Sequence, residues 1–166
     1  ADMLRKGITA MELLLTAGVA PRRVVIASSA NVYGNATVEP ITEATPPAPV
    51  NHYAASKLAM EWMVRTYADR LPIVMTRPFN YTGVGQTESF LVPKLVAHFA
   101  QRRPHVELGN LDVVRDFSDV RTVAQAYVRL LTADVPDGVT NLCSGVGRSL
   151  RWVVEQLREM SGHDLD

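Results

Sequence analysis

The chain has 166 residues, enough for one domain with a buried core, and 47% of them are hydrophobic. Its 17 Lys and Arg residues balance 17 Asp and Glu residues, so no basic field is available to hold a nucleic acid or an anionic membrane surface. No apolar run is long enough to span a bilayer, and the single cysteine, Cys143, cannot form an internal disulfide. We therefore expect a globular cytoplasmic protein that binds neither nucleic acid nor membrane.

Helix and strand signals alternate along the chain. Amphipathic runs of helix formers predict helices, and short β-branched apolar runs predict buried strands. In chain order, helices are expected at 7–17, 53–70, 90–102, from the cap Asp119 to about 132 and from the cap Ser149 to about 162, and strands at 23–28, 73–76, 106–108 and 139–143. Residues 39–50 and 79–89 are expected to be loops, the second a candidate ligand loop. The alternation predicts an α/β fold with a parallel sheet.

Tyr53 and Lys57 are the strongest chemical signal. They stand four residues apart on the helix expected at 53–70 and therefore share one of its faces. A free tyrosine, with a pKa of about 10, is a poor acid–base catalyst near neutrality, but a nearby ammonium group favours the phenolate. Such a pair could exchange a proton with a carbonyl or hydroxyl group. Taken alone, a Y-x-x-x-K match is far more often a helix-start aromatic followed by a solvated lysine.

The residues that precede this pair favour the catalytic interpretation. The strand expected at 23–28 runs directly into Ser29-Ala30-Asn31-Val32-Tyr33-Gly34. A hydroxyl just beyond the carboxyl end of a parallel strand lies where open α/β sheets bind their ligands. Ser29 could therefore hydrogen-bond the substrate oxygen that Tyr53 protonates. Turn chemistry at the strand end is the alternative for Ser29, and it is the preferred interpretation for Ser28.

The sequence S-S-A-N-V-Y-G, followed by a proline-containing loop, Y-A-A-S-K and R-P-F-N at 77–80, resembles the extended short-chain dehydrogenases that act on nucleotide sugars. The resemblance implies the C-terminal portion of a Rossmann-like doubly wound parallel sheet, with a small substrate-binding α/β lobe. It also implies NAD or NADP as cofactor, a nucleotide-sugar substrate and a homodimer formed by the helices 7–17 and 53–70. The site residues that it implies are Ser29, Tyr53 and Lys57 for catalysis, Ala27, Ser28, Tyr53, Lys57, Pro78 and Asn80 for the cofactor, and Asn31, Asn80, Val92, Lys94, Asn110 and Arg115 for the substrate.

One hallmark of that family, the fingerprint G-x-x-G-x-x-G after a first strand, does not occur in this sequence. We therefore expect a single partial domain, the C-terminal part of a longer protein, in which about 1–80 complete the cofactor sheet and about 81–166 hold the substrate-binding elements. The cofactor's phosphate cradle is expected to lie outside the chain. A fragment that only binds or dimerises is the non-enzymatic alternative. The four histidines show no metal-ligand spacing, so no metal is expected.

Two further stretches are similar to GDP-linked members of the family. Residues 108–117, L-G-N-L-D-V-V-R-D-F, resemble a segment of GDP-mannose 4,6-dehydratases and GDP-4-keto-6-deoxy-mannose reductases. Asn110 could bind a base or phosphate and Arg115 could clamp a diphosphate, whereas the alternative is a surface turn with Arg115 paired to a carboxylate. Residues 90–94, F-L-V-P-K, resemble the start of the GDP-binding helix, where Lys94 either meets the diphosphate or is a solvated lysine.

Asn31 departs from the dehydratase pattern. The sugar 4,6-dehydratases have a glutamate at this position, which moves protons while water is lost. An amide neither takes up nor releases a proton at ordinary pH, so Asn31 argues against dehydration. The leading prediction is therefore reduction of GDP-4-keto-6-deoxy-mannose to GDP-rhamnose. A nucleotide-sugar 4-epimerase and a 4,6-dehydratase are the enzymatic alternatives.

Overall fold

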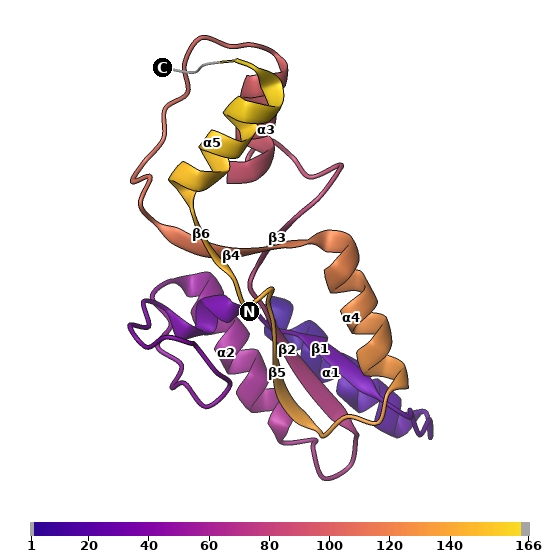
Figure 1. Ribbon diagram of the computed structural model, residues 1–166. Helices are drawn as coiled ribbons and strands as arrows, with labels where there is room; N and C mark the ends of the chain where they lie inside the picture. Colours follow the sequence, from indigo (N-terminus) through magenta and orange to yellow (C-terminus); the bar gives the residue numbers. More distant parts are fainter. Residues whose placement is uncertain (1, 164–166) are drawn as a thin grey trace. The chain divides into compact units, whose positions relative to one another are not determined.

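A computed structural model describes residues 2–163 and confirms the α/β fold with a parallel sheet (Figure 1). The chain divides into two compact units. One holds the residues up to Phe79 together with Val123–Leu142, and the other holds Asn80–Thr122 together with those from Cys143 onward. The chain therefore leaves the first unit after Phe79 and returns to it through residues 123–142.

The first unit is built on a parallel sheet of three strands. Its strands are β1 (Val24–Ala27), β2 (Ile73–Pro78) and β5 (Gly138–Leu142), hydrogen-bonded in the order β1-β2-β5. Every residue of the central strand β2 is buried. A strand covered on both faces needs a nearly continuous apolar sequence, and the run 73–75 supplies it.

Helices cover both faces of this sheet. Helices α1 (Asp2–Thr16) and α2 (His52–Arg65) pack together on one face, where Met11, Met60 and Met75 belong to a single buried cluster. On β2 the residue after Met75 points to the opposite face, because side chains alternate along a strand. That residue, Thr76, shares a hydrogen bond of 2.7 Å with the Tyr127 hydroxyl of helix α4 (Val120–Thr132).

The second unit has its own small sheet. Its strands are β3 (Asn80–Thr82), β4 (Val114–Asp119) and β6 (Gly147–Ser149), with β3 parallel and β6 antiparallel to β4. Helices α3 (Leu91–Ala100) and α5 (Leu150–Ser161) pack against each other. The expected caps are confirmed, because the Ser149 hydroxyl accepts the Trp152 N–H and Gly162 closes α5 in the left-handed conformation.

The start of α4 is also capped as expected. The Asp119 carboxylate accepts the backbone N–H of Arg121 at 2.8 Å and also pairs with that residue's guanidinium group. The hydrogen bond from the Arg121 guanidinium group has the larger effect and the one from the Arg121 backbone N–H the smaller, and together they lower the pKa of Asp119 to about 2. Among residues 2–163, no helix combines the length and apolar character needed to cross a bilayer.

Several expected boundaries are wrong. The stretch 106–108 forms no strand, and the Glu107 carbonyl instead accepts a hydrogen bond from the Lys94 ammonium group. The helix expected to reach residue 70 ends at Arg65, because the following turns tighten to hydrogen bonds between residues three apart. Strands β3, β4 and β6 were not predicted from the sequence, since they are short and lack an apolar period.

Candidate active site

Ser29 lies at the carboxyl end of β1 and begins a short 3₁₀ helix, η1 (Ala30–Tyr33). Its side chain is buried, and its hydroxyl oxygen accepts the Asn31 N–H at 3.2 Å. Ser29 therefore makes the turn contact that the sequence offered as the alternative to a catalytic role. A hydroxyl that accepts one hydrogen bond still has a proton to donate, so this contact leaves the catalytic role open.

Gly34 ends η1 in a conformation that a side chain would not tolerate. Its φ is +60°, and an added Cβ would come within 1.9 Å of the Ala48 carbonyl oxygen. The Ala48 N–H also donates to the Val32 carbonyl at 2.9 Å. The glycine of V-Y-G thus lets the proline-containing loop pack closely against the turn that carries Ser29.

Ser28 behaves differently from Ser29. It is only 3% exposed, its N–H donates to Thr76, and its hydroxyl has no hydrogen-bond partner among the described residues. The interpretation of its hydroxyl as a turn-forming group is therefore wrong. A buried hydroxyl without a partner costs about 1–3 kcal/mol, so it favours a bound water or ligand at this strand end. The neighbouring Ala27 is exposed at the end of its strand, which leaves room for that ligand.

The structure brings Tyr53 and Lys57 together on the first two turns of α2. The Asn51 side chain caps this helix by accepting the Ala54 N–H at 2.8 Å. The Lys57 ammonium nitrogen lies 5.9 Å from the centre of the Tyr53 ring and donates to the Ala27 carbonyl oxygen at 2.7 Å. Burial lowers the pKa of Lys57. The lysine therefore ties the tyrosine's helix to the strand end that leads into Ser29.

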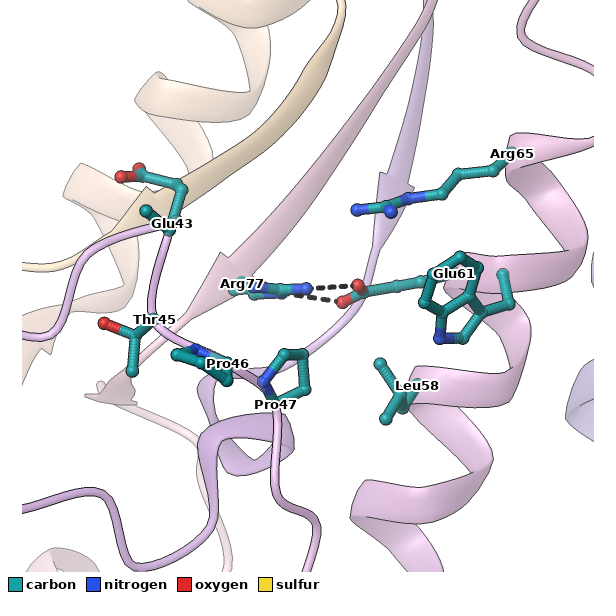
Figure 2. A pocket seen from close by; sticks show the side chains of 10 residues that line it. Glu43, Thr45, Pro46, Pro47, Leu58, Glu61, Arg65 and Arg77 are labelled. Carbon is teal, nitrogen blue, oxygen red and sulfur yellow. Dashed lines mark hydrogen bonds and ion pairs between the residues drawn. The ribbon is translucent and has the colours of Figure 1, made fainter.

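A buried polar network lies further along α2 (Figure 2). The Arg77 guanidinium group forms a bidentate ion pair with Glu61, at 2.9 and 2.5 Å, and both side chains are at most 3% exposed. Arg77 also donates to the Tyr33 hydroxyl at 3.0 Å, and that hydroxyl donates to the Asn141 side chain at 2.7 Å. Burial opposes the charge on Arg77, but the hydrogen bonds to Glu61 and Tyr33 raise its pKa above the ordinary value.

This network joins the elements that carry the catalytic candidates. Tyr33 ends η1, which Ser29 begins, and Glu61 lies one helical turn after Lys57 on α2. Sequence reasoning missed Glu61, although its place four residues after Lys57 was a signal for the same helix face. A pocket of about 120 Å³ lies beside the ion pair, between α2 and residues 43–47 (Figure 2). It is smaller than the usual ligand pocket of about 300–1,000 Å³, so it does not hold a nucleotide.

Several of the other candidates lie in the second unit. Asn80 begins β3 and donates to the Asp116 carbonyl at 3.2 Å, and Asn110 forms a turn by accepting the Asp112 N–H at 2.9 Å. Val92 and Lys94 lie in the first turns of α3 and are partly buried. Lys94 is not a simple solvated lysine, because it donates to a backbone carbonyl as described above. Of the remaining candidates, Asn31 is exposed on η1 and Pro78 is buried at the end of β2.

Arg115 does not pair with a carboxylate in the part of the chain that the structure describes. It is exposed on β4 and donates to the Val114 carbonyl at 2.7 Å. The carboxylate-paired alternative is therefore wrong. The neighbouring Asp116, which sequence reasoning missed, accepts the backbone N–H groups of Ser144, Gly145 and Val146 at 2.7–3.2 Å. Asp116 thus anchors the loop that leads into β6.

Within residues 2–163, no group of three or more His, Cys, Asp or Glu side chains gathers as metal ligands. A serine after a parallel strand, with a Tyr-x-x-x-Lys helix bonded to the end of that strand, defines a site of the short-chain dehydrogenase class. Residues 2–143 match the family described as the NAD dependent epimerase/dehydratase family, and the chain belongs to it.

Named relatives narrow the comparison to nucleotide-sugar enzymes. The chain is 38% identical over 148 residues to GDP-6-deoxy-D-talose 4-dehydrogenase of Aggregatibacter actinomycetemcomitans, covering 89% of this chain and 50% of that protein. It is 35% identical over 148 residues to GDP-6-deoxy-D-mannose reductase of Pseudomonas aeruginosa, covering 84% and 49%. The structure of RMD from Pseudomonas aeruginosa complexed with NADPH matches with a TM-score of 0.90 and 32% identity, over 96% of this chain and 57% of that one. The chain thus spans about half the length of these relatives.

Proposed function

We propose that the full-length protein is an NAD(P)-dependent nucleotide-sugar oxidoreductase of the cytoplasm that reduces GDP-4-keto-6-deoxy-mannose to GDP-rhamnose. The observation that carries the proposal is the Lys57 contact with Ala27, which ties Tyr53 to the strand end that leads into Ser29. The names of the two GDP-sugar relatives support the substrate class.

The residues at the end of β1 fit a nicotinamide cofactor. Ala27 is exposed there, and the buried Ser28 hydroxyl needs a partner that the described residues do not supply. We infer that these two residues, with Lys57 and Pro78 of the same unit, border the cofactor. When bound, NADH or NADPH supplies the hydride for the sugar's C4 carbon.

The protein's own residues then handle the proton. Tyr53 donates its hydroxyl proton to the C4 oxygen, which becomes negatively charged as the carbonyl is reduced. Ser29 donates a hydrogen bond to the same oxygen and thereby orients it. Lys57 stabilises the phenolate that remains, because an ammonium group favours a nearby negative charge. Tyr53 is 47% exposed, so water can return its proton.

Asn31 separates this reaction from dehydration. It is exposed on η1 and offers no titratable group to remove the C5 proton or to help the C6 hydroxyl leave. We therefore expect that the full-length protein, given NAD and GDP-mannose, releases no 4-keto-6-deoxy product. Given the keto sugar with NADPH or NADH, it should oxidise the reduced cofactor and form GDP-rhamnose or its C4 epimer.

NMR analysis of the products checks this prediction. GDP-4-keto-6-deoxy-mannose formed from GDP-mannose would contradict the reductase assignment and favour a dehydratase. Interconversion of C4 epimers without net consumption of cofactor would favour the 4-epimerase instead. The Tyr53→Phe protein is the matched control, because cofactor oxidation that continues in it at the wild-type rate does not depend on the Tyr53 hydroxyl.

We also propose that the protein forms a homodimer through α1 and α2. Leu13 and Trp62 are each 61% exposed, and the two helices that carry them pack against each other. Large exposed apolar side chains are typical of interaction surfaces. Trp62→Glu should convert the dimer to a monomer at micromolar concentration, because it places a charge in the interface. Sedimentation velocity measures the change. Val128→Glu is the control, since Val128 is equally exposed but lies on α4. A wild-type protein that is already monomeric would refute the proposal.

A further inference from the structure

Two arginines face each other across the small sheet of the second unit. In the antiparallel pairing of β4 with β6, Arg115 lies directly opposite Arg148. Directly opposed residues point to the same face, with their Cβ atoms about 4.5–5.5 Å apart, and like charges in these positions destabilise a sheet. Because the two positive charges repel each other, a nearby negative charge would stabilise this pair of arginines.

The acidic residues of this region do not supply that charge. The Asp116 carboxylate is occupied by the N–H groups of residues 144–146 and by the Ser144 hydroxyl at 2.9 Å. Asp112 pairs with Arg151 at 2.9 Å. Within the described chain, neither Arg115 nor Arg148 forms an ion pair, and both are exposed. The Arg115 guanidinium group donates one hydrogen bond to the Val114 carbonyl, and its other N–H groups and the charges of both arginines remain available to an anion from solution.

Arg148 is also held in position by its surroundings. The central carbon of its guanidinium group lies 4.5 Å from the centre of the Trp152 ring on α5. A cation resting on an indole face is attracted by the ring and loses rotational freedom before any ligand arrives. Stacking over an aromatic face leaves the N–H groups at the rim of the guanidinium plane free to donate.

The pairing register places a third polar group on the same face. Asn80 of β3 pairs with Phe117, and Phe117 lies two residues after Arg115 on β4. Residues two apart on a strand share a face, so Asn80 lies on the same face as Arg115 and Arg148, beside Phe117 and diagonal to Arg115. One N–H of its amide donates to the Asp116 carbonyl, and an amide nitrogen carries a second N–H. One amide and two guanidinium groups on one face of the sheet suit a ligand with several neighbouring anionic oxygens.

We propose that Arg148 is a second phosphate-binding residue, which forms with Arg115 a clamp of two guanidinium groups for a nucleoside diphosphate. The inference rests on the proposed function for the identity of the ligand. Each guanidinium group can bind phosphate oxygens bidentately, and two adjacent phosphates can engage both groups at once. The ligand then supplies the negative charge that the opposed arginines lack.

Calorimetric titration of the full-length protein with GDP, UDP, pyrophosphate and guanosine tests the clamp. Arg148→Ala and Arg115→Ala should each weaken GDP binding by about 10- to 100-fold, as expected for a lost charge-assisted hydrogen bond. Guanosine binding should not change, because guanosine carries no phosphate. The GDP affinity of Arg148→Lys should lie between those of the wild type and Arg148→Ala. Lysine keeps the positive charge but lacks the planar guanidinium group that binds phosphate bidentately. Arg151→Ala is the control, because Arg151 already pairs with Asp112.

The outcomes separate this inference from the proposed function. The role of Arg148 would be overturned if Arg148→Ala bound GDP and pyrophosphate as the wild type does while Arg115→Ala did not bind them. Arg148 would then only stack on the Trp152 ring. Equal losses for GDP and guanosine would overturn that role too, because they indicate a structural defect. Wild-type binding of UDP or pyrophosphate but not GDP, weakened by Arg148→Ala, would support the clamp and overturn the GDP-sugar assignment. A wild-type protein that binds none of the phosphates would overturn the clamp.

Discussion

Tyr53→Phe should lower the turnover of the full-length enzyme by about 10²–10⁴-fold and leave substrate affinity nearly unchanged. The substitution removes only the hydroxyl that we assign as proton donor. The ring keeps its place near Lys57, whose ammonium group is bound to the Ala27 carbonyl as well. A loss confined to kcat would therefore report proton donation and not a misplaced helix.

Steady-state kinetics with the keto sugar and NADPH or NADH measure this effect. Tyr67→Phe is the matched control, because it removes a hydroxyl from a tyrosine that follows α2 and packs against the core. Turnover near the wild-type value in Tyr53→Phe would remove Tyr53 from the mechanism. An equal loss in both variants would point to a folding defect instead.

Glu61→Ala should lower the free energy of unfolding by about 3–5 kcal/mol, because it leaves the Arg77 charge buried without its partner. Glu61 is 1% exposed and Arg77 is 2% exposed, so bulk water screens the remaining charge only weakly. The same change should also lower turnover, since the network joins α2 to β2 and to the turn that carries Ser29.

Chemical denaturation of the wild type and variants measures the stability change. Asp119→Ala provides the surface comparison, because the partner of Asp119 in its ion pair, Arg121, has a side chain that is 83% exposed. That substitution removes an exposed ion pair, which water screens, and one helix cap, so it should destabilise the protein much less than Glu61→Ala. A Glu61→Ala variant as stable as the Asp119→Ala variant would show that the buried pair is not needed. The double change Glu61→Leu and Arg77→Met should recover most of the loss, since no charge then remains buried.

The sequence by itself determined the features that depend on neighbours in the chain. Tyr53 and Lys57 share a helix face because they are four residues apart, and Ser149 and Gly162 cap α5 because their chemistry suits helix ends. The parallel strands β1 and β2 were recognisable because both are short runs of β-branched apolar residues. Strand β2 is buried throughout, as expected, whereas β1 is only partly buried and ends on the exposed Ala27. The family resemblance, which the comparisons confirm, rests on the same local motifs.

Only the tertiary structure decided which distant residues meet. Glu61 and Arg77 lie on different elements, so no local period revealed that they neutralise each other. Arg148 lies opposite Arg115 only through the register of β4 and β6, and these strands are too short and polar to show a pattern of their own. The return of residues 123–142 to the first unit depends on the pairing of β5 with β2. In the chain these two strands are separated by β3, α3, β4 and α4. Each of these contacts joins residues far apart in the chain, and its free energy comes from burial or pairing that exists only once the chain has folded.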